Sequence, residues 1–434
     1  MFIEKISKNI PIINDTYKAV CDSNITVAEI GKALHSMKKG RAPGIDGLSV
    51  EFYVHFWEYI QDPLICMYKE CVEQKEMTTT MKQGIISLIP KPGKDAHCID
   101  NWRPISLLTI DYKILALVYA NRLKTGLGDI ISETQSGFMK NCHITNNIRL
   151  VLDLLDYADA VQSQALLLFL DFYKAFDTIE HAFLLKTLKL FGFGDYFINI
   201  IEMLYQDINS SVIINQNTTN RFEINRGIRQ GCPVSPFLFL LVTELLALSV
   251  IHDLEFKGIH IFDREIKIAQ LADDTILFMQ DKDQLSCALT LVEQFSSASG
   301  LKLNISKCEI LPLHECDDNV MKNIPVKHTV KYLGIHITKN VTDRQQLNYT
   351  TKMAKTKSIF NSWLQRDLSM ADGLSHFLYP SFSLFINNKS LKEINKNFLD
   401  FIWKNKPHKL KKEVLSDCKA KGGLDFLDFT DTVN

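Results

Sequence analysis

Three aspartates stand where carboxylates could do chemistry. Asp171 directly follows a continuous apolar run, Ala165–Leu170, which is typical of a strand buried on both faces. Asp273 and Asp274 lie at the turn of a tight hairpin formed by two further apolar runs within residues 266–279. A carboxylate at the end of an apolar strand is costly unless a cationic group meets it. If the strands are neighbours, the three acids converge on one point.

Convergent carboxylates would suit divalent-cation chemistry. Mg²⁺ takes hard oxygen ligands and keeps room for water and phosphate oxygens. Two such ions about 4 Å apart would clamp the attacking and leaving oxygens of an in-line phosphoryl displacement. Taken alone, however, the Asp273–Asp274 pair is better explained as an ordinary hairpin turn. Other parts of the sequence are therefore needed to distinguish a metal site from a plain turn.

The elements that would position these acids follow from hydrophobic periodicity, which predicts a mixed α+β chain. We expect helices over 27–38, 50–76, 113–123, 179–191, 237–256 and 285–295, and strands over 84–89, 165–170, 211–215, 221–225, 266–271, 275–279, 308–311 and 330–337. From about residue 340 the pattern turns helical and basic, and Ser390–Glu393 matches a capping box at the start of a further helix.

The composition is that of a folded globular protein, because the 434 residues are 46% hydrophobic and 23% charged. About 150 residues per domain predicts roughly three structural units. No apolar run approaches the ~18 residues of a membrane helix, and the N-terminus has no signal-peptide pattern. We therefore expect a soluble intracellular protein, cytoplasmic or nuclear. The ten cysteines form no CxxC pair and no zinc box, which favours reduced thiols.

The charge is unevenly distributed behind a net charge of −1. Residues 321–423 carry more Lys and Arg than Asp and Glu, whereas residues 1–320 carry more acidic than basic residues. A basic final quarter on an acidic body indicates a face that meets a polyanion. A solvated, lysine-rich helical surface explains the same pattern equally well.

An ordered series of motifs decides between these interpretations. The chain contains KKGRAPGIDGLSVEFY, LIPKPGKD, NWRPISLLTIDYKILALVYANRLK, QSGFM, FLDFYKAFD, GIRQGCPVSPFLF, LADD, SGLKLNISK and KYLGI, in this order. With these motifs the chain resembles the reverse transcriptases of LINE-type non-LTR retrotransposons, from about residue 25 to its end.

The resemblance implies a right-handed polymerase fold with fingers, a palm of antiparallel sheet and helices, and a helical thumb. Residues 1–69 would be an N-terminal extension leading into the fingers. Residues 70–343 would be the reverse transcriptase domain of fingers and palm, and residues 344–434 the basic thumb.

The resemblance also implies an RNA-directed DNA polymerase, which adds dNTPs to a DNA or RNA primer 3′ end on an RNA template, as in LINE-type retrotransposition. Two Mg²⁺ ions, for which Mn²⁺ could substitute, would assist the phosphoryl transfer. Two rival functions stay open. One is a catalytically silent nucleic-acid-binding remnant, and the other is an RNA-dependent RNA polymerase, against which Phe176 argues.

Residue roles follow from the same resemblance. The metal ions would be held by four groups, Asp171, Asp273, Asp274 and the backbone carbonyl of Phe172. Phe176, five residues after Asp171, would be the steric gate that leaves no room for a 2′-hydroxyl. The alternative for this ring is an ordinary core phenylalanine.

The incoming nucleotide would meet four further residues. Arg103 would fork onto the triphosphate and Lys91 would add a point charge, although Lys91 is as well explained as a solvated loop lysine. Gln230 would hydrogen-bond near the sugar, and Gly231 would let the backbone approach the nucleotide closely.

Two further roles concern proton transfer and the primer. Lys307 would donate a proton to pyrophosphate, a role for which Lys302 competes. The primer grip would be the turn Tyr332, Leu333 and Gly334, for which a plain strand end is the alternative.

The chain departs from the family pattern in three ways. Leu271 stands where the family usually has an aromatic before ADD, and we expect tuning rather than loss of activity. The segment SMADGLS, Ser369–Ser375, looks shorter than in relatives, which puts thumb packing in doubt. The chain also lacks the endonuclease and the Cys/His segment of full-length relatives, so we expect that it could not nick its own target.

Overall fold

The computed structural model describes residues 2–363, 384, 386 and 388–403, and the prediction of a mixed α+β chain is confirmed. The chain divides into two compact units, and each is described by itself. Unit 1 comprises Met1–Cys142, Ala165–Cys308 and Lys322–Ile324. Unit 2 comprises His143–Gln164, Glu309–Met321 and Pro325–Asn434.

Unit 1 contains most of the helices. Their bounds are α1 Phe2–Ile6, α2 Asp15–Asp22, α3 Val27–Ser36, α4 Val50–His55, α5 Trp57–Gln74, α6 Thr79–Lys82, α7 Ile110–Lys124, α9 Ala175–Thr178, α10 His181–Leu190, α11 Asp195–Tyr205, α12 Ser235–Ile251 and α13 Gln284–Ser299. Two predicted helices are corrected: the helix predicted over 50–76 is interrupted at Phe56, and α12 ends at Ile251 rather than at residue 256.

The strands of unit 1 form several sheets. Their bounds are β1 Gln83–Pro90, β2 Trp102–Leu107, β3 Leu166–Leu170, β4 Phe172–Tyr173, β5 Asn209–Ile214, β6 Asn217–Thr218, β7 Phe222–Glu223, β8 Ile259–Ile261, β9 Arg264–Ile266, β10 Ile268–Leu271, β11 Asp274–Met279 and β12 Lys302–Leu303. One sheet has the order β2-β1-β5-β6, with β7 also paired to β5.

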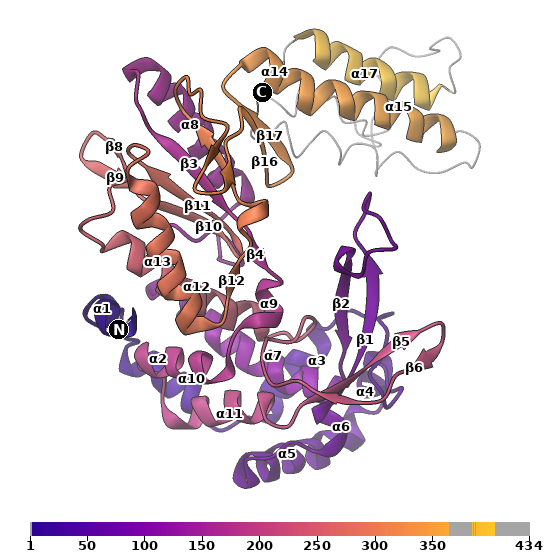
Figure 1. Ribbon diagram of the computed structural model, residues 1–434. Helices are drawn as coiled ribbons and strands as arrows, with labels where there is room; N and C mark the ends of the chain where they lie inside the picture. The colour runs from indigo at the N-terminus through magenta and orange to yellow at the C-terminus, as the bar shows by residue number, and fades with distance from the viewer. Residues whose placement is uncertain (1, 364–383, 385, 387, 404–434) are drawn as a thin grey trace, which may run out of the picture. The chain divides into compact units, whose positions relative to one another are not determined.

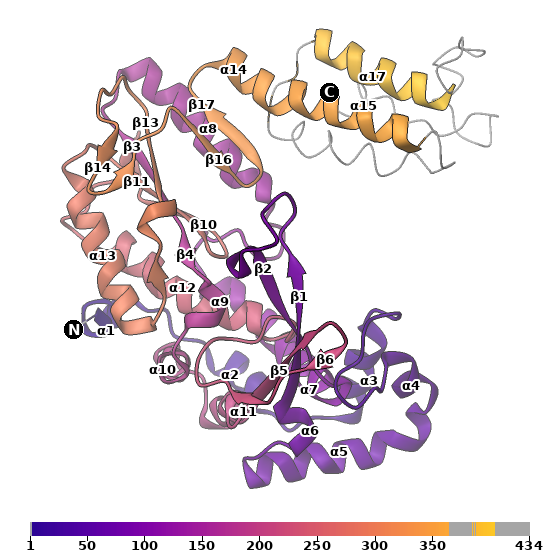
Figure 2. The ribbon, with the colours of Figure 1, turned by 45° about the vertical axis from the view of Figure 1, so that its right-hand side comes forward.

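A second sheet forms the centre of unit 1, where β10, β11 and β3 are antiparallel neighbours in that order. Every residue of β3 is buried, as its continuous apolar sequence predicts. Helix α12 contacts β10 and helix α13 contacts β11, so both helices help to cover the sheet (Figures 1 and 2). Almost all of α12 is buried because it is apolar on every side.

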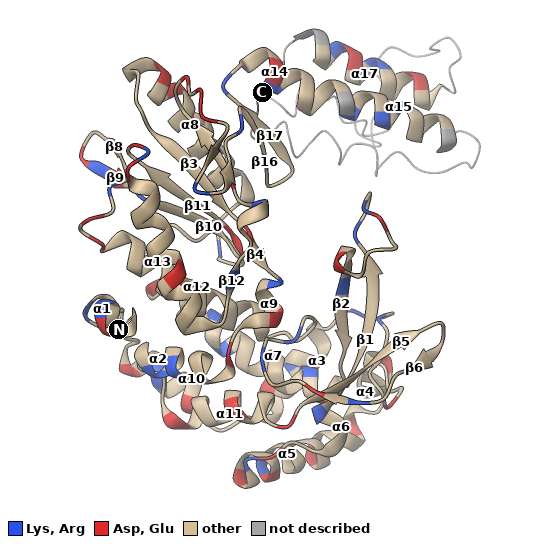
Figure 3. Ribbon diagram, viewed as in Figure 1, with Lys and Arg blue, Asp and Glu red and all other residues tan. Residues whose placement is uncertain are grey.

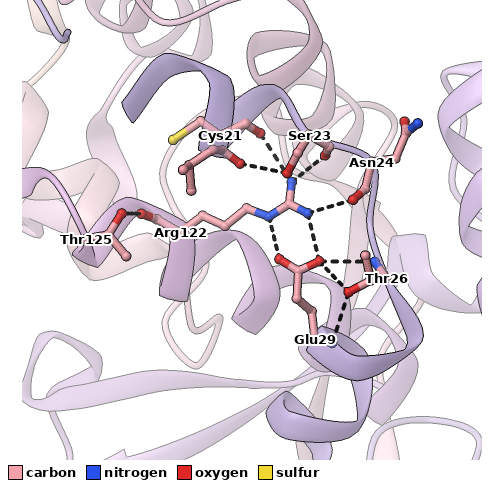
Figure 4. A network of polar contacts seen from close by, with 8 residues as sticks. Cys21, Ser23, Asn24, Thr26, Glu29, Arg122 and Thr125 are labelled. Atoms are coloured by element: carbon pink, nitrogen blue, oxygen red, sulfur yellow. Dashed lines mark hydrogen bonds and ion pairs between the residues drawn. The ribbon is translucent and has the colours of Figure 1, made fainter. Parts of the chain in front are cut away.

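A buried arginine joins α7 to the N-terminal part of unit 1 (Figure 4). The Arg122 side chain is 4% exposed, and its Nε and Nη2 donate to the two carboxylate oxygens of Glu29 at 2.8 and 2.9 Å. Its guanidinium also donates to three backbone carbonyl oxygens within residues 21–24. Glu29 in turn accepts from the backbone and the hydroxyl of Thr26, which caps α3. Because the guanidinium is surrounded by acceptors, the charge can be buried.

Unit 2 combines helices with short strands. The bounds are α8 Ile144–Val161, β13 Glu309–Pro312, β14 Val320–Met321, β16 Thr329–Tyr332, β17 Ile335–Thr338, α14 Val341–Gln345, α15 Thr351–Trp363 and α17 Asn388–Ile402. Within the unit, the ring of Phe360 on α15 packs against Phe398 and Phe401 of α17 at 5.1 and 4.5 Å between centroids.

Two predictions for unit 2 are wrong. The strand predicted over 330–337 is a hairpin of β16 and β17, because Leu333 and Gly334 both have positive φ, 46° and 80°. Two such residues in succession suit a tight two-residue turn. Helix α17 begins at Asn388, so Ser390 lies in its first turn and does not cap it. The departure predicted at Ser369–Ser375 lies outside the described residues.

Two other expectations concern cysteines and membranes. The described cysteines are all free thiols, as expected. In the described part of the chain, no helix is both long enough and apolar enough to cross a membrane.

Candidate active site

The structure brings the three aspartates to one edge of the central sheet. Strand β3 ends at Leu170, which pairs with Thr275 of β11, and Asp171 follows directly. Asp274 begins β11 and pairs with Leu271 at the end of β10, so Asp273 lies at the tip of their hairpin. We call residues 271–274 the aspartate turn. Figure 3 shows the acidic residues where β10, β11 and β4 meet.

The neighbouring carboxylates affect the protonation of Asp273 and Asp274. Asp273 and Asp274 are exposed to solvent, although the nearby protein removes part of the hydration of each carboxyl group. Partial loss of solvation and then the charges of Asp273 and Asp171 raise the pKa of Asp274 to about 6. Loss of solvation and the charge of Asp171 likewise raise the pKa of Asp273. The convergence of the acids that the sequence predicts is therefore present in the structure.

The donor chemistry of this edge fits a divalent cation. Three carboxylates that repel one another leave an excess of negative charge, which a cation would neutralise. Across the described ranges, no three His, Cys, Asp or Glu side chains are gathered closely enough to hold a metal ion as they stand. The side chains would have to turn toward a common point to coordinate one, so the ligand set stays a prediction.

The segment that follows α13 is tied to the backbone beside Asp171. The N–H of Asn304 donates to Asp171 O at 2.8 Å, and Leu303 pairs with Phe172 in the short β12–β4 ladder. Lys307 ends the next turn and is exposed, which leaves its ammonium free to move toward a substrate. Lys302, its competitor for the proton-donor role, pairs across the ladder with Tyr173.

The predicted triphosphate ligands lie on β1 and β2. Lys91 follows β1, and its ammonium donates to Asp100 O at 2.9 Å, so it helps to close its own loop. Arg103 lies on β2 opposite Ile89 and is exposed. Within the described ranges no hydrogen bond or ion pair occupies the Arg103 guanidinium, which leaves it available for an anion.

The predicted steric gate is fixed by stacking. The Phe176 ring lies on the Phe239 ring of α12, with 4.5 Å between centroids and 5° between ring planes. The N–H of Ile228 also donates to Phe176 O at 2.7 Å. The gate and the loop that precedes α12 are therefore held together.

Gln230 and Gly231 contact protein groups on both sides. Gln230 Nε2 donates to Asp177 Oδ1 at 3.2 Å, and Gln230 O accepts from Ser106 N at 2.9 Å. Gly231 has φ 112°, and a Cβ there would lie 2.6 Å from Ser106 O. In the structure this glycine allows a close approach to the backbone of β2. Whether it also serves a nucleotide stays a prediction.

The predicted primer grip belongs to unit 2, where Tyr332, Leu333 and Gly334 form the end of β16 and its turn. The Tyr332 hydroxyl accepts from Asn147 Nδ2 of α8 at 3.3 Å. The turn is thereby fixed within its own unit, and its role at a primer stays a prediction.

Sequence reasoning assigned no role to two residues of the QSGFM motif that touch the aspartate turn. Gln135 Oε1 accepts from the N–H of Ala272, and Gly137 lies against the same N–H. The only sequence signal for these two residues is their place in an ordered motif.

Comparison with known proteins places these features in a family. Residues 89–337, more than half of the chain, match the family described as reverse transcriptase (RNA-dependent DNA polymerase). The transposon TX1 149 kDa protein of Xenopus laevis is 29% identical over 420 residues, 92% of this chain and 32% of that protein. The RNA-directed DNA polymerase from mobile element jockey of Drosophila melanogaster is 23% identical over 79% of this chain and 38% of its own length.

The chain therefore spans about a third of the length of these relatives. Among solved structures, a telomerase from Candida tropicalis in complex with a TWJ fragment of telomeric RNA is 12% identical with a TM-score of 0.45. That match covers 82% of this chain and 58% of the telomerase chain.

Proposed function

The chain belongs to the reverse transcriptase family of non-LTR retrotransposons, and from this premise we propose that it is an RNA-directed DNA polymerase. It would add dNTPs to a DNA or RNA primer 3′-hydroxyl opposite an RNA template. The observation that carries the proposal is the convergence of Asp171, Asp273 and Asp274 at one sheet edge, with raised pKa values for the last two.

The proposed architecture is a right hand. The central sheet of β10, β11 and β3 with α12 and α13 would be the palm. The sheet of β2, β1 and β5 with its helices would belong to the fingers, and the basic helices from residue 344 onward to the thumb. The proposed divisions remain 1–69, 70–343 and 344–434.

The acids would hold two Mg²⁺ ions, or Mn²⁺ in their place, together with the carbonyl of Phe172. When bound, such ions lower the pKa of a primer 3′-hydroxyl and neutralise triphosphate charge. Asp171, Asp273 and Asp274 provide the negative site that fixes where the two reacting groups meet. Lys307, exposed on the turn tied to Asp171, would donate a proton to the leaving pyrophosphate.

The remaining residues would bind and orient the nucleotide. The Arg103 guanidinium, which has no partner among the described residues, would make a bidentate contact with the triphosphate, with Lys91 as a weaker second charge. Phe176, held flat against Phe239, would exclude a 2′-hydroxyl. Gln230 would hydrogen-bond near the sugar, beside Gly231. In unit 2, the Tyr332–Gly334 turn would position the primer end.

Primer extension tests the proposal directly. Purified protein is mixed with an RNA template, an annealed DNA primer, Mg²⁺ and dNTPs. Asp273→Asn should lower extension by more than about a hundredfold, because it removes one carboxylate from the site. Asp195→Asn, at the exposed start of α11, is the matched control and should extend normally.

A template-binding measurement distinguishes the proposed polymerase from the rival function, a catalytically silent nucleic-acid-binding remnant. A wild-type chain that binds the template–primer but does not extend it would support the silent nucleic-acid-binding remnant and contradict the polymerase proposal. Extension that survives Asp273→Asn would contradict the assignment of the acids.

A further inference from the structure

The segment Ser132–Gly137 lies beside the central sheet, and the proposed function gives it no part. Gln270 of β10 donates its N–H to Thr134 O at 2.8 Å and accepts from Ser136 N at 2.9 Å. Between these two hydrogen bonds, residue 135 forms a parallel bridge with Gln270. The segment thus runs beside β10 up to the aspartate turn, and we call it the brace.

One buried side chain of the brace holds the aspartate turn. The Gln135 residue is 1% exposed, and its Oε1 accepts from Ala272 N at 2.9 Å and from Gly137 N at 2.8 Å. Ala272 has φ 57°, a left-handed conformation that residues with a Cβ rarely adopt. A strained residue persists only where its surroundings hold it, and here the holding group is the Gln135 amide.

The brace and the turn also meet backbone to backbone. A Cβ on Gly137 would lie 2.5 Å from Ala272 N, so only glycine permits this approach. At the other end of the brace, the carboxylate of Glu244 accepts from the N–H of Ser132 at 3.1 Å and from its hydroxyl. The brace therefore runs from buried helix α12 to the residue directly before Asp273.

Gln135 is a costly residue for this place. Its Nε2 is buried and has no hydrogen-bond partner among the described residues, which is unfavourable for a donor. An apolar side chain of the same length would avoid that cost but would leave Ala272 N without its acceptor. The structure thus provides an acceptor for the Ala272 N–H while it leaves the Gln135 Nε2 without a hydrogen-bond partner among the described residues.

We propose that Gln135 is a positioning residue, whose amide oxygen fixes the backbone of the aspartate turn and so aims the Asp273 and Asp274 carboxylates for cation binding and catalysis. This inference rests on the proposed polymerase function for its catalytic part. It requires no contact between Gln135 and substrate.

Two variants of the same length test the proposal. Gln135→Met removes the acceptor, whereas Gln135→Glu keeps one. In Gln135→Met we expect faster hydrogen exchange at the Ala272 amide and weaker Mn²⁺ binding, measured by electron paramagnetic resonance. We also expect kcat for primer extension to fall by about tenfold to a hundredfold with an unchanged KM for dNTP, because misaligned groups lose rate rather than nucleotide affinity. Gln135→Glu should restore slow exchange at the Ala272 amide.

A remote variant controls for general destabilisation. Arg122→Met also removes a buried polar side chain, but its hydrogen bonds lie within residues 21–29. It should lower the melting temperature while leaving Ala272 exchange and kcat per folded molecule unchanged. If Arg122→Met reproduces the losses of Gln135→Met, or if Gln135→Met leaves Ala272 exchange at the wild-type rate, the proposal is overturned.

The failure of the proposed function would be recognised separately. A wild-type chain without primer extension contradicts the polymerase assignment. The brace would then still be judged by Ala272 exchange and by Mn²⁺ affinity, neither of which needs turnover.

Discussion

Single residues in the candidate site are fixed as much by packing as by charge. The Phe176 ring is stacked flat on Phe239, so it cannot swing aside without breaking that stack. A ring that is held in this way cannot move aside to admit a 2′-hydroxyl, which is what the proposed steric gate requires.

If Phe176 is the steric gate, shortening its side chain should make room for a 2′-hydroxyl. Phe176→Val is expected to reduce discrimination against ribonucleotides by roughly ten- to a hundredfold, because the wall under the sugar is removed. Competing dNTP and rNTP incorporation measures the ratio. Phe239→Leu is the companion variant, because it keeps the Phe176 ring but removes the partner that holds it, and a smaller loss of discrimination is expected. An unchanged ratio in Phe176→Val would remove the gate assignment.

At the scale of elements, the sequence predicted well where apolar runs are continuous or alternate clearly. Strands β3, β10 and β11 lie close to their predicted positions, because buried strands leave a local signal. Hydrophobic periodicity did not show the break in the strand predicted over 330–337, because Leu333 is not a residue that usually adopts positive φ. The family resemblance, in contrast, implied a turn at these residues. The brace was missed for another reason: its contacts join segments far apart in the chain, and periodicity reports only local order.

Helix α12 carries a single carboxyl group in its buried length. Burial raises the pKa of Glu244 to about 7, although hydrogen bonds from Ser132 oppose the shift. Because the folded pKa lies above the ordinary value of 4.5, the stabilising contribution of protonated Glu244 is fully present below about pH 4.5. That contribution is lost as the pH rises through about 7.

Glu244→Gln should therefore flatten the dependence of stability on pH. Relative to the variant, the wild type should lose roughly 3 kcal/mol of unfolding free energy between acidic and mildly alkaline pH. Urea unfolding over that range measures the difference. Glu202→Gln, at an exposed position of α11, should keep the wild-type profile. Parallel wild-type and Glu244→Gln profiles would show that this carboxyl group does not titrate as described.

At the scale of the whole molecule, the small net charge conceals an uneven distribution of basic residues along the chain. The chain carries 49 basic and 50 acidic residues, yet the excess of Lys and Arg gathers after residue 320. If the final quarter contacts phosphates, binding must release counterions.

RNA affinity should consequently fall steeply with salt. About six phosphate contacts would weaken binding roughly 10³-fold between about 50 and 200 mM salt. Fluorescence anisotropy with a labelled template–primer measures the slope. Replacing the exposed Lys355 and Lys357 of α15 by Gln should lower the slope by about one for each phosphate that is no longer bound. The pair Lys186 and Lys189 on α10 is the matched control, and salt-independent binding would refute the basic-thumb proposal.

The buried arginine of α7 has a consequence for where this protein can be cut. The part of the chain that matches the family begins at residue 89, whereas among the described residues the Arg122 guanidinium hydrogen-bonds only within residues 21–29. A fragment trimmed to the recognisable region would lose these hydrogen bonds together with α2 and α3, which pack against α7. The face of α7 that those helices cover would then be exposed to water, which destabilises the fragment. The region that matches the family and the region that is needed for stable folding therefore begin at different residues, and the folding region begins earlier in the chain.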